Sequence, residues 1–352
     1  MARTEISTLG EFGLIDHLTK DIKPTNASTV KGIGDDCAVI NSGNMQTLIS
    51  TDLLLEGVHF DLTYVPLKHL GYKAAMVNIS DIYAMNATPT QMVVSLGISK
   101  RFCIEDIEQL YEGIQQACKN HKVDIVGGDT TSSLTGLAIS ITVVGQATAN
   151  DIVCRSGAKD TDLICVSGDL GAAYMGLQLL EREKSVFQTQ SKQYKNEEAE
   201  FKPDFAGKEY LLERQLKPEA RGDIIRKLKE ADIKPTSMID ISDGLSSELL
   251  HICHQSHVGC SVYEERIPID YQTSMLAEQF NLNPLTCALN GGEDYELLFT
   301  TALSDYEKVR EIEGIHIIGH IEKESIGCQL IMRSGDEYPL KAQGWNHMDR
   351  EE

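Results

Sequence analysis

Carboxylates placed beside glycines are the residues of this sequence best suited to chemistry. The segment Gly32–Asp36 sets two adjacent aspartates behind two glycines, and Asp52, Asp129 and Asp240 each follow a strand-like run. Glycine lets a backbone approach a ligand closely, and neighbouring carboxylates repel one another unless a cation lies between them. Each of these residues, taken alone, is better explained as a turn residue or a helix cap than as part of a site. Their repetition favours a shared site, and the full set is Asp35, Asp36, Asp52, Asp81, Asp129, Asp240, Asp243, Glu293 and Asp294.

Converging carboxylates would need counter-charge. Two unit charges 4 Å apart interact by roughly 4 kcal/mol at an effective dielectric constant near 20. Hard divalent cations supply that charge, and Mg²⁺ favours one or two carboxylates together with waters and phosphate oxygens. Several such ions sharing carboxylates would let an acidic protein hold a triphosphate. The residues therefore predict magnesium-dependent nucleotide chemistry.

Motifs that are missing narrow the possibilities. The sequence contains no G-x-x-x-x-G-K-[ST], no G-x-G-x-x-G after a strand and no G-x-S-x-G, which excludes P-loop enzymes and argues against dinucleotide-binding and serine hydrolase sites. Cysteines and histidines do not show zinc-finger spacing. His251, His254 and His257 approach one face at helical spacing, but surface or packed histidines are the favoured interpretation.

Composition restricts the class of protein. The chain has 352 residues, of which 41% are hydrophobic, so it can bury substantial cores and is long enough for two domains. Its 32 basic and 53 acidic residues give a net charge of −21, which makes it a poor binder of nucleic acid or anionic membranes. Nine scattered cysteines without a C-x-x-C pair indicate reduced thiols. With no signal pattern and no membrane-spanning apolar run, we expect a cytoplasmic protein.

Two α/β units must position the carboxylates that follow glycines and strand-like runs. We expect an N-terminal domain over 1–150 and a C-terminal domain over 151–352, with a mobile surface insertion at 182–217 because that segment is rich in Gln, Lys and Glu. Asp52 and Asp129 are expected where strands end. The expected first-unit elements are a helix over 9–20, a strand over 47–50, a loop over 56–60, a helix over 71–85, a strand over 92–98, a helix over 104–120 and strands over 123–126 and 137–144. Those of the second are a strand over 163–166, a helix over 219–230, a strand at 238–239, a helix over 245–255, a strand over 295–301, a helix over 305–313 and strands over 316–321 and 329–332.

The segments that carry these carboxylates, in their order along the chain, resemble those of the bacterial thiamine-monophosphate kinase family. Glu56–Phe60 and Gly291–Phe299 carry most of the specificity of the match. The other matching segments are 10–15, 32–36, 50–52, 78–81, 127–130, 167–171, 240–245 and 344–345, so the resemblance covers nearly the whole chain outside 182–217.

This resemblance implies a fold shared with aminoimidazole-ribonucleotide synthetase and selenophosphate synthetase. It implies two α/β domains, the first of them ferredoxin-like and responsible for binding ATP and Mg²⁺, and a homodimer paired through the first domains. The implied reaction is transfer of the γ-phosphoryl group of ATP to thiamine monophosphate, the last step of thiamine diphosphate biosynthesis.

The resemblance also implies roles for particular residues. Asp52 and Asp243 are expected to be the most critical of the metal ligands, and no general base is expected because a phosphate oxygen is already a nucleophile. Trp345 could stack against the cationic thiazolium ring. The implied metal ligands are Asp35, Asp36, Thr51, Asp52, Asp81, Asp129, Asp240 and Asp243, of which either Asp35 or Asp36 could be the direct one. The implied ATP-binding residues are Tyr111, Gly128, Asp129, Arg155 and Ser242, and the implied substrate-binding residues are His59, Glu293 and Trp345.

Two positions depart from the family pattern. Asn86 stands where the family usually has glycine, and because Asn best tolerates the left-handed conformation we expect the helix C-cap to survive. Cys154 replaces the glycine before Arg155. Two rival functions stay open: another ATP-using synthetase of the same fold, and a divalent-cation-binding module without catalysis. The N-terminal segment lacks the reactive Cys of selenophosphate synthetases.

Overall fold

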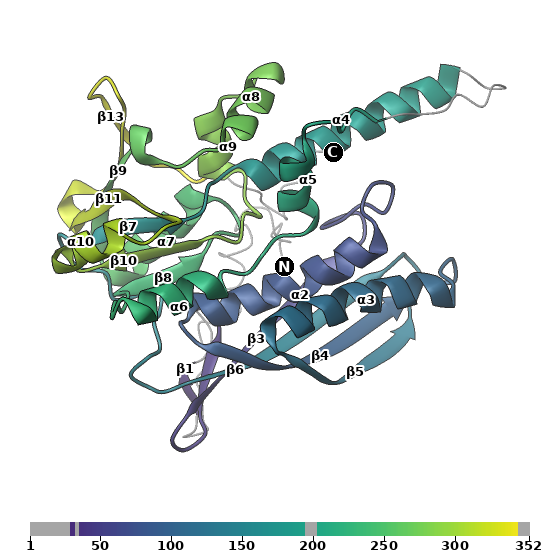
Figure 1. Cartoon of the computed structure of the whole chain (residues 1–352), viewed down its shortest axis with the longest axis horizontal. Coiled ribbons are helices and arrows are strands. Elements are labelled where there is room, and N and C mark those ends of the chain that lie inside the picture. The colour runs from purple at the N-terminus through teal and green to yellow at the C-terminus, as the bar shows by residue number, and fades with distance from the viewer. Residues whose placement is uncertain (1–28, 32–34, 194–202, 344–352) are drawn as a thin grey trace, which may run out of the picture.

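Two β-sheets that follow one another along the chain organise this protein (Figure 1). The computed structural model describes residues 29–31, 35–193 and 203–343. The expected helix over 9–20, the glycines at 32 and 34, and Trp345 lie outside the described residues. No helix in these ranges is long and apolar enough to cross a membrane.

The first sheet has the strand order β1-β2-β3-β6-β4-β5. Neighbouring strands are antiparallel except β4 and β5, which run parallel because a helix connects them. The strands are β1 (Thr29–Lys31), β2 (Ala38–Asn41), β3 (Gln46–Leu55), β4 (Thr88–Ile98), β5 (Asp124–Ser132) and β6 (Ala138–Ala147).

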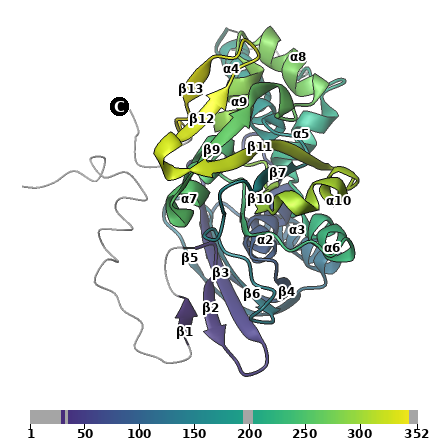
Figure 2. The same cartoon turned by 90° about the vertical axis from the view of Figure 1, so that its left-hand side faces the viewer.

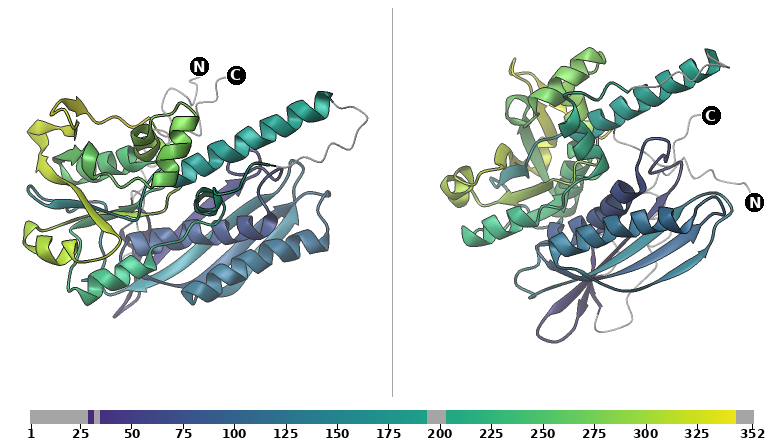
Figure 3. Two further views of the ribbon diagram at one scale, coloured as in Figure 1. Left: turned by 45° about the horizontal axis from the view of Figure 1, so that its top comes forward. Right: turned by 45° about the vertical axis from the view of Figure 1, so that its right-hand side comes forward.

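Two helices, α2 (Leu67–Ala84) and α3 (Ile104–His121), lie on one face of this sheet (Figure 3). In α3 the buried residues Leu110, Ile114 and Ala117 recur at helical spacing on a single face. Most residues of α2 are buried, because this helix packs on the sheet on one side and on the second unit on the other. Two helices on one face match the expected layers. The elements follow one another along the chain as β3-α2-β4-α3-β5-β6, which differs from the ferredoxin-like order β-α-β-β-α-β.

The second sheet has the strand order β13-β12-β9-β11-β7-β10-β8. Strand β7, which lies between β11 and β10, is buried on both faces. The strands are β7 (Leu163–Ser167), β8 (Ser237–Asp240), β9 (Val258–Tyr263), β10 (Leu297–Thr301), β11 (Ile315–Lys323), β12 (Cys328–Ile331) and β13 (Glu337–Pro339). The helices are α4 (Ala172–Gln193), α5 (Glu209–Leu216), α6 (Gly222–Glu230), α7 (Leu245–Ser256), α8 (Tyr271–Gln279), α9 (Pro284–Asn290) and α10 (Tyr306–Arg310), with 3₁₀ turns at Glu264–Arg266, Leu303–Asp305 and Glu324–Ile326.

Helix α2 joins the two units. It contacts β8, α5 and α6 of the second unit, and in Figure 1 it lies between the first sheet and those elements. Ala84, at its C-terminal end, belongs to a core cluster with Met238 and Phe299. Figure 2 shows the resulting stack, with the second sheet above the first. Residues at the end of β8 are therefore brought beside α2.

Several local expectations can be compared with the structure. Strands β3 and β5 extend past the predicted ends, so Asp52 and Asp129 lie within strands and not at their exits. Asp240 does end a strand. Asn86 has a φ of +56°, which confirms the left-handed C-cap expected after α2. Of the segment 182–217, the residues up to Gln193 belong to α4 and those from Glu209 to Leu216 form α5, so these parts are helical and not irregular.

Candidate active site

Three carboxylates from distant parts of the chain converge where α2 meets the second sheet. Asp36 precedes β2, Asp81 lies in α2 and Asp240 ends β8. One carboxylate oxygen from each lies within 4.8 Å of those of the other two. The structure thus brings together acids that the sequence placed at separate junctions.

Hydroxyl and amide groups orient these carboxylates. The Ser80 hydroxyl donates a 2.5 Å hydrogen bond to Asp240 Oδ2, and the Ser50 hydroxyl donates to Asp81. Asp52, in the middle of β3, donates its backbone N–H to Asn78 Oδ1 at 3.0 Å. Because Asn78 and Ser80 come from α2, that helix fixes residues of both sheets around one point.

Negative charge is concentrated in this cluster. Removal from water, and then the charge of Asp36, raise the pKa of Asp52 to about 6. The same two causes raise the pKa of Asp240 to about 7. Loss of water and the charges of Asp52 and Asp240 raise the pKa of Asp81 well above its usual range. The negative charge of the cluster is therefore only partly balanced by cationic side chains.

Arg155 offsets part of that charge at Asp36. Its Nη2 lies 2.5 Å from Asp36 Oδ1. The other oxygen, Asp36 Oδ2, is buried and accepts no hydrogen bond from any residue that the structure describes. Burying a carboxylate oxygen without a partner is costly. An oxygen-liganded cation beside Asp36, Asp81 and Asp240 would remove this cost, so the donor set fits a hard divalent ion.

Asp35 plays a different part from its neighbour. Its carboxylate contacts the Lys31 ammonium and accepts the backbone N–H of Asp36 at 3.0 Å. The backbone N–H of Arg155 lies 3.4 Å from both of its oxygens. Asp35 therefore holds the turn, whereas Asp36 faces the cluster.

Asp243 lies beyond the three-carboxylate group, at the start of α7. Its backbone N–H donates to Glu248 Oε1 at 3.0 Å. Burial, and then the charge of Asp243, raise the pKa of Glu248 well above its usual range. Glu248 was not among the predicted site residues, because an acid inside a helix gives no junction signal. Ser242 is exposed beside Asp243.

Three of the predicted site residues, Thr51, Gly128 and Asp129, lie away from the carboxylate cluster of their own chain. Pairing across the sheet places Asp129 beside Ser95 on the face opposite the helices, and Thr51 shares that face. From β3 to β5 is three strand spacings, or roughly 14 Å. Gly128 faces the helices, but a Cβ there would lie 1.9 Å from the Val94 carbonyl oxygen. Glycine at 128 is thus required for strand pairing.

Tyr111 lines a separate pocket on α3. This pocket has a volume of about 410 Å³ and its lining exposes mainly apolar atoms. The lining residues are Phe102, Cys103, Ile104, Ile107, Glu108 and Tyr111. The pocket is a shallow hollow that opens widely to the surface, and its wall is mainly apolar.

His59 and Glu293 lie near one another on the other side of α2. Glu293 pairs with Lys73 at 2.9 Å and accepts a hydrogen bond from Gln215 Nε2, also at 2.9 Å. Although burial opposes ionisation, Lys73, Gln215 and the charge of His59 lower the pKa of Glu293. His59 Nδ1 accepts the backbone N–H of Leu55 at 3.0 Å. Lys73 was not predicted, because it sits among apolar residues of α2.

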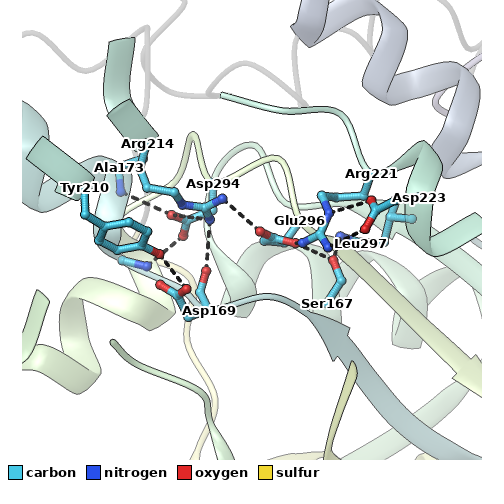
Figure 4. Close-up of polar contacts among 11 residues, drawn as sticks. Ser167, Asp169, Ala173, Tyr210, Arg214, Arg221, Asp223, Asp294, Glu296 and Leu297 are labelled. Carbon is cyan, nitrogen blue, oxygen red and sulfur yellow. Dashed lines mark hydrogen bonds and ion pairs between the residues drawn. The ribbon is translucent and has the colours of Figure 1, made fainter. Parts of the chain in front are cut away.

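A buried ion-pair network supports the loop that carries Glu293 (Figure 4). Arg214 of α5 donates to Glu296 Oε1 at 2.8 Å and to the carbonyl oxygen of Asp169 at 3.0 Å. Arg221 contacts the other oxygen of Glu296. Arg214 and Gln215 belong to the segment 182–217, and Gln215 is only 5% exposed. The insertion interpretation is therefore wrong for α5, which is built into the core.

Comparisons with known proteins identify the class of fold. Residues 34–147 match the family described as AIR synthase related protein, N-terminal domain. A solved structure of the hydrogenase maturation protein HypE in complex with ATP shares the fold, with a TM-score of 0.66 at 18% identity over 98% of this chain and 100% of that chain. The first unit thus matches the AIR synthase related family, and the whole two-sheet fold is shared with that solved structure.

Closer relatives define the family. The thiamine-monophosphate kinase of Aquifex aeolicus is 33% identical over 89% of this chain and 96% of its own length, and that of Bacillus subtilis is 31% identical over 96% and 99%. A structure described as AaThiL complexed with AMPPCP and TMP has a TM-score of 0.82 at 31% identity, covering 99% of this chain and 100% of that one. The chain belongs to the thiamine-monophosphate kinase family.

Proposed function

We propose that this chain transfers the γ-phosphoryl group of ATP to the phosphate of thiamine monophosphate, giving ADP and thiamine diphosphate. This is the last step of thiamine diphosphate biosynthesis. The observation that carries the proposal is the convergence of Asp36, Asp81 and Asp240, with Asp52 beside them, between the two sheets. The names of the relatives and the described AMPPCP and TMP complex support the substrate pair. Nine free cysteines fit the cytoplasm as its location.

Mg²⁺ is the proposed cofactor, held as several ions by Asp36, Asp52, Asp81 and Asp240, with Asp243 at the edge. Bound Mg²⁺ would neutralise charge on the phosphate oxygens of the two anionic substrates. Ser50 and Ser80 hold two of the carboxylates in place through their hydroxyls. Asp35 supports the turn and is not the proposed direct ligand.

Arg155 is proposed to face the phosphate chain of ATP. Its Nη2 fixes Asp36, while its Nε is buried with no hydrogen-bond partner among the described residues. Nε lies 4.0 Å from Asp35 Oδ1, beyond hydrogen-bonding distance, so it can still donate to an anionic oxygen of a ligand. Ser242 contributes an exposed hydroxyl at the end of β8, and the pocket at Tyr111 is proposed to take the adenine ring.

Glu293 and His59 are proposed to bind the thiamine portion of the acceptor. Glu293 stays ionised because Lys73 and Gln215 hold its two oxygens, so it presents negative charge to the cationic thiazolium ring. Trp345 remains a predicted partner of that ring. Since the acceptor oxygen is already anionic, these residues need to align the acceptor and not to remove a proton.

A homodimer is proposed through the first sheet. The face opposite α2 and α3 exposes apolar side chains, with Leu53 53% and Val126 61% exposed. The same face carries Thr51 and Asp129, which cannot reach the cluster of their own chain. A second copy packed on this face would allow Asp129 of one chain to serve the site of the other. This arrangement reconciles the predicted ligands with their placement.

Product analysis tests the proposed function. The purified chain is incubated with Mg-ATP and thiamine monophosphate, and ADP and thiamine diphosphate are quantified together. Equal amounts of both are expected, with none when Mg²⁺ is chelated or when unphosphorylated thiamine replaces the acceptor. ADP release without thiamine diphosphate would refute the proposal and favour another ATP-using reaction of this fold. No turnover with retained metal binding would favour the cation-binding module.

A further inference from the structure

A second cluster of metal-ligating side chains lies in the second sheet. Cys253 of α7, Cys260 of β9 and Cys328 of β12 place their sulfur atoms within 4.8 Å of one another. Within the described ranges, this and the carboxylate cluster are the two such groups of three or more His, Cys, Asp or Glu residues. Every member here is a thiol, so its chemistry differs from that of the carboxylates.

Local structure explains why the three thiols meet. Strands β9 and β12 are parallel neighbours in which Cys260 pairs directly with Cys328, so both side chains leave the same face of the sheet. A Cβ at Gly259 would lie 2.3 Å from the carbonyl oxygen of Gly327, so glycine there permits the two chain segments to approach closely. Helix α7 packs on this sheet and adds Cys253 to the core that contains Cys260.

Ordinary core packing is the plainer explanation of a buried cysteine. Free cysteines often fill cores as small apolar residues. Cys118, which contacts the sulfur of Met92 at 3.7 Å, fits that description. The three clustered thiols differ because they come from three separate elements, α7, β9 and β12, and all of their sulfur atoms lie within 4.8 Å of one another. Packing alone does not require three thiols to converge on one point.

We propose that Cys253, Cys260 and Cys328 form a three-coordinate site for a soft d¹⁰ cation, of which Cu(I) is the physiological example. Sulfur ligands select soft ions, and Cu(I) accepts three of them. Zn²⁺ requires a fourth ligand, and no His, Asp, Glu or further Cys joins this group in the described part of the chain. A water is a poor fourth ligand here, since Cys260 is 0% and Cys253 is 3% exposed.

The separation of the three sulfur atoms suits a three-coordinate Cu(I) ion. Three sulfurs that each lie about 2.3 Å from a central ion stand about 4 Å apart, within the separation seen in the structure. Each thiol that becomes a ligand releases its proton to solvent, and no redox change is involved. Cys328 is half-buried and gives the ion a route from the surface. Binding would tie α7, which begins next to Asp243, to the sheet.

Competition for Cu(I) tests this site directly. The reduced, full-length chain is titrated with Cu(I) under anaerobic conditions in the presence of bicinchoninate, whose Cu(I) complex is coloured. We expect one equivalent per chain to be withheld from the chelator, and copper K-edge absorption to report three sulfur ligands. Cys328→Ser, at the half-buried position, should weaken Cu(I) binding by at least about 100-fold.

Cys103→Ser is the matched control, because Cys103 is exposed on the first unit and should leave Cu(I) binding unchanged. Circular dichroism confirms that each variant is folded. The proposal is overturned if no Cu(I) is withheld, if Cys328→Ser binds as tightly as the unaltered chain, or if only two sulfurs are found. Retention of Zn²⁺ in preference to Cu(I) would also overturn it.

Discussion

Ser80 of α2 donates a 2.5 Å hydrogen bond to Asp240 at the end of β8, and so links the first unit of the chain to a carboxylate of the second. The two residues are separated by 160 positions in the sequence. Ser80 is fully buried, so water cannot replace its hydroxyl. The orientation of Asp240 toward Asp36 and Asp81 therefore depends on how α2 packs against β8.

Replacing Ser80 with alanine tests this dependence. We expect Ser80→Ala to raise the Mg²⁺ concentration needed for half-maximal activity by about 10- to 100-fold, the usual effect of removing a group that orients a metal ligand. Ser246→Ala is the matched control. Ser246 is also a buried helical serine, but its hydroxyl has no hydrogen-bond partner among the residues that the structure describes. Equal Mg²⁺ dependence of the two variants would contradict the role of Ser80.

Lys73→Met tests the acceptor side of the site. Loss of the ammonium removes the cationic partner of Glu293, while the hydrogen bond from Gln215 stays in place. We expect the KM for thiamine monophosphate to rise while the KM for ATP stays unchanged, and the free energy of unfolding to fall by about 2 kcal/mol. Steady-state kinetics and urea unfolding measure both quantities.

Lys68→Met provides the comparison, because Lys68 lies on the same helix and pairs with Glu112 on the surface at 3.1 Å. Exposed pairs contribute roughly 0 to 1 kcal/mol, so this variant should change little. A selective rise in the KM for ATP in Lys73→Met would argue against acceptor binding by Glu293.

Asp294 gives a prediction about pH. Burial raises its pKa to about 7, although Arg214 and the backbone N–H of Gly171 favour its ionised form. Between about pH 4 and 7 the unfolded chain loses this proton while the folded chain keeps it, so stability falls as pH rises and then levels off. The effect amounts to at most about 1.4 kcal/mol per pH unit.

Asp294→Asn removes this titration. The free energy of unfolding of the unaltered chain, minus that of the variant, should decrease from pH 4.5 to 7 and stay constant above that range. Urea unfolding at several pH values measures the difference. A difference that is independent of pH would show that Asp294 is ionised throughout.

Mixing two inactive variants tests the shared site. If Asp129 serves the partner chain, a hybrid dimer of Asp52→Asn and Asp129→Asn contains one site with both aspartates intact. After equal mixing and subunit exchange, we expect about a quarter of the unaltered activity, because half of the dimers are hybrids and each has one intact site. No recovery after confirmed exchange would show that Asp129 does not serve the site of the partner chain.

Residue types and spacing predicted much of the candidate site. Asp36, Asp81 and Asp240 could be expected to converge, because carboxylates recur at turns and strand ends in this sequence, several of them beside glycine. Asp129 was expected with them, but the face of a strand that a residue occupies depends on its register, which a single sequence does not fix. The outer placement of Asp129 follows from pairing with Ser95.

Contacts between helix residues and distant parts of the chain were harder to predict. The segment containing α5 was interpreted as an insertion because it is rich in charged and polar residues. Its Arg214 is instead buried by pairing with Glu296, a contact between residues far apart in the chain. Lys73 was missed for a similar reason, since its partner Glu293 comes from the second unit. Tertiary ion pairs of this kind leave no local signal.

The Mg²⁺ dependence of Asp52→Asn tests the central claim most directly. Asparagine keeps the shape of the side chain and leaves the backbone bond to Asn78 in place, so the fold should be preserved. Formation of thiamine diphosphate is measured across a Mg²⁺ titration, with the exposed Asp160→Asn as control. The account predicts a loss of turnover of at least about 100-fold for Asp52→Asn and none for the control. Near-normal activity of Asp52→Asn at limiting Mg²⁺ would contradict it.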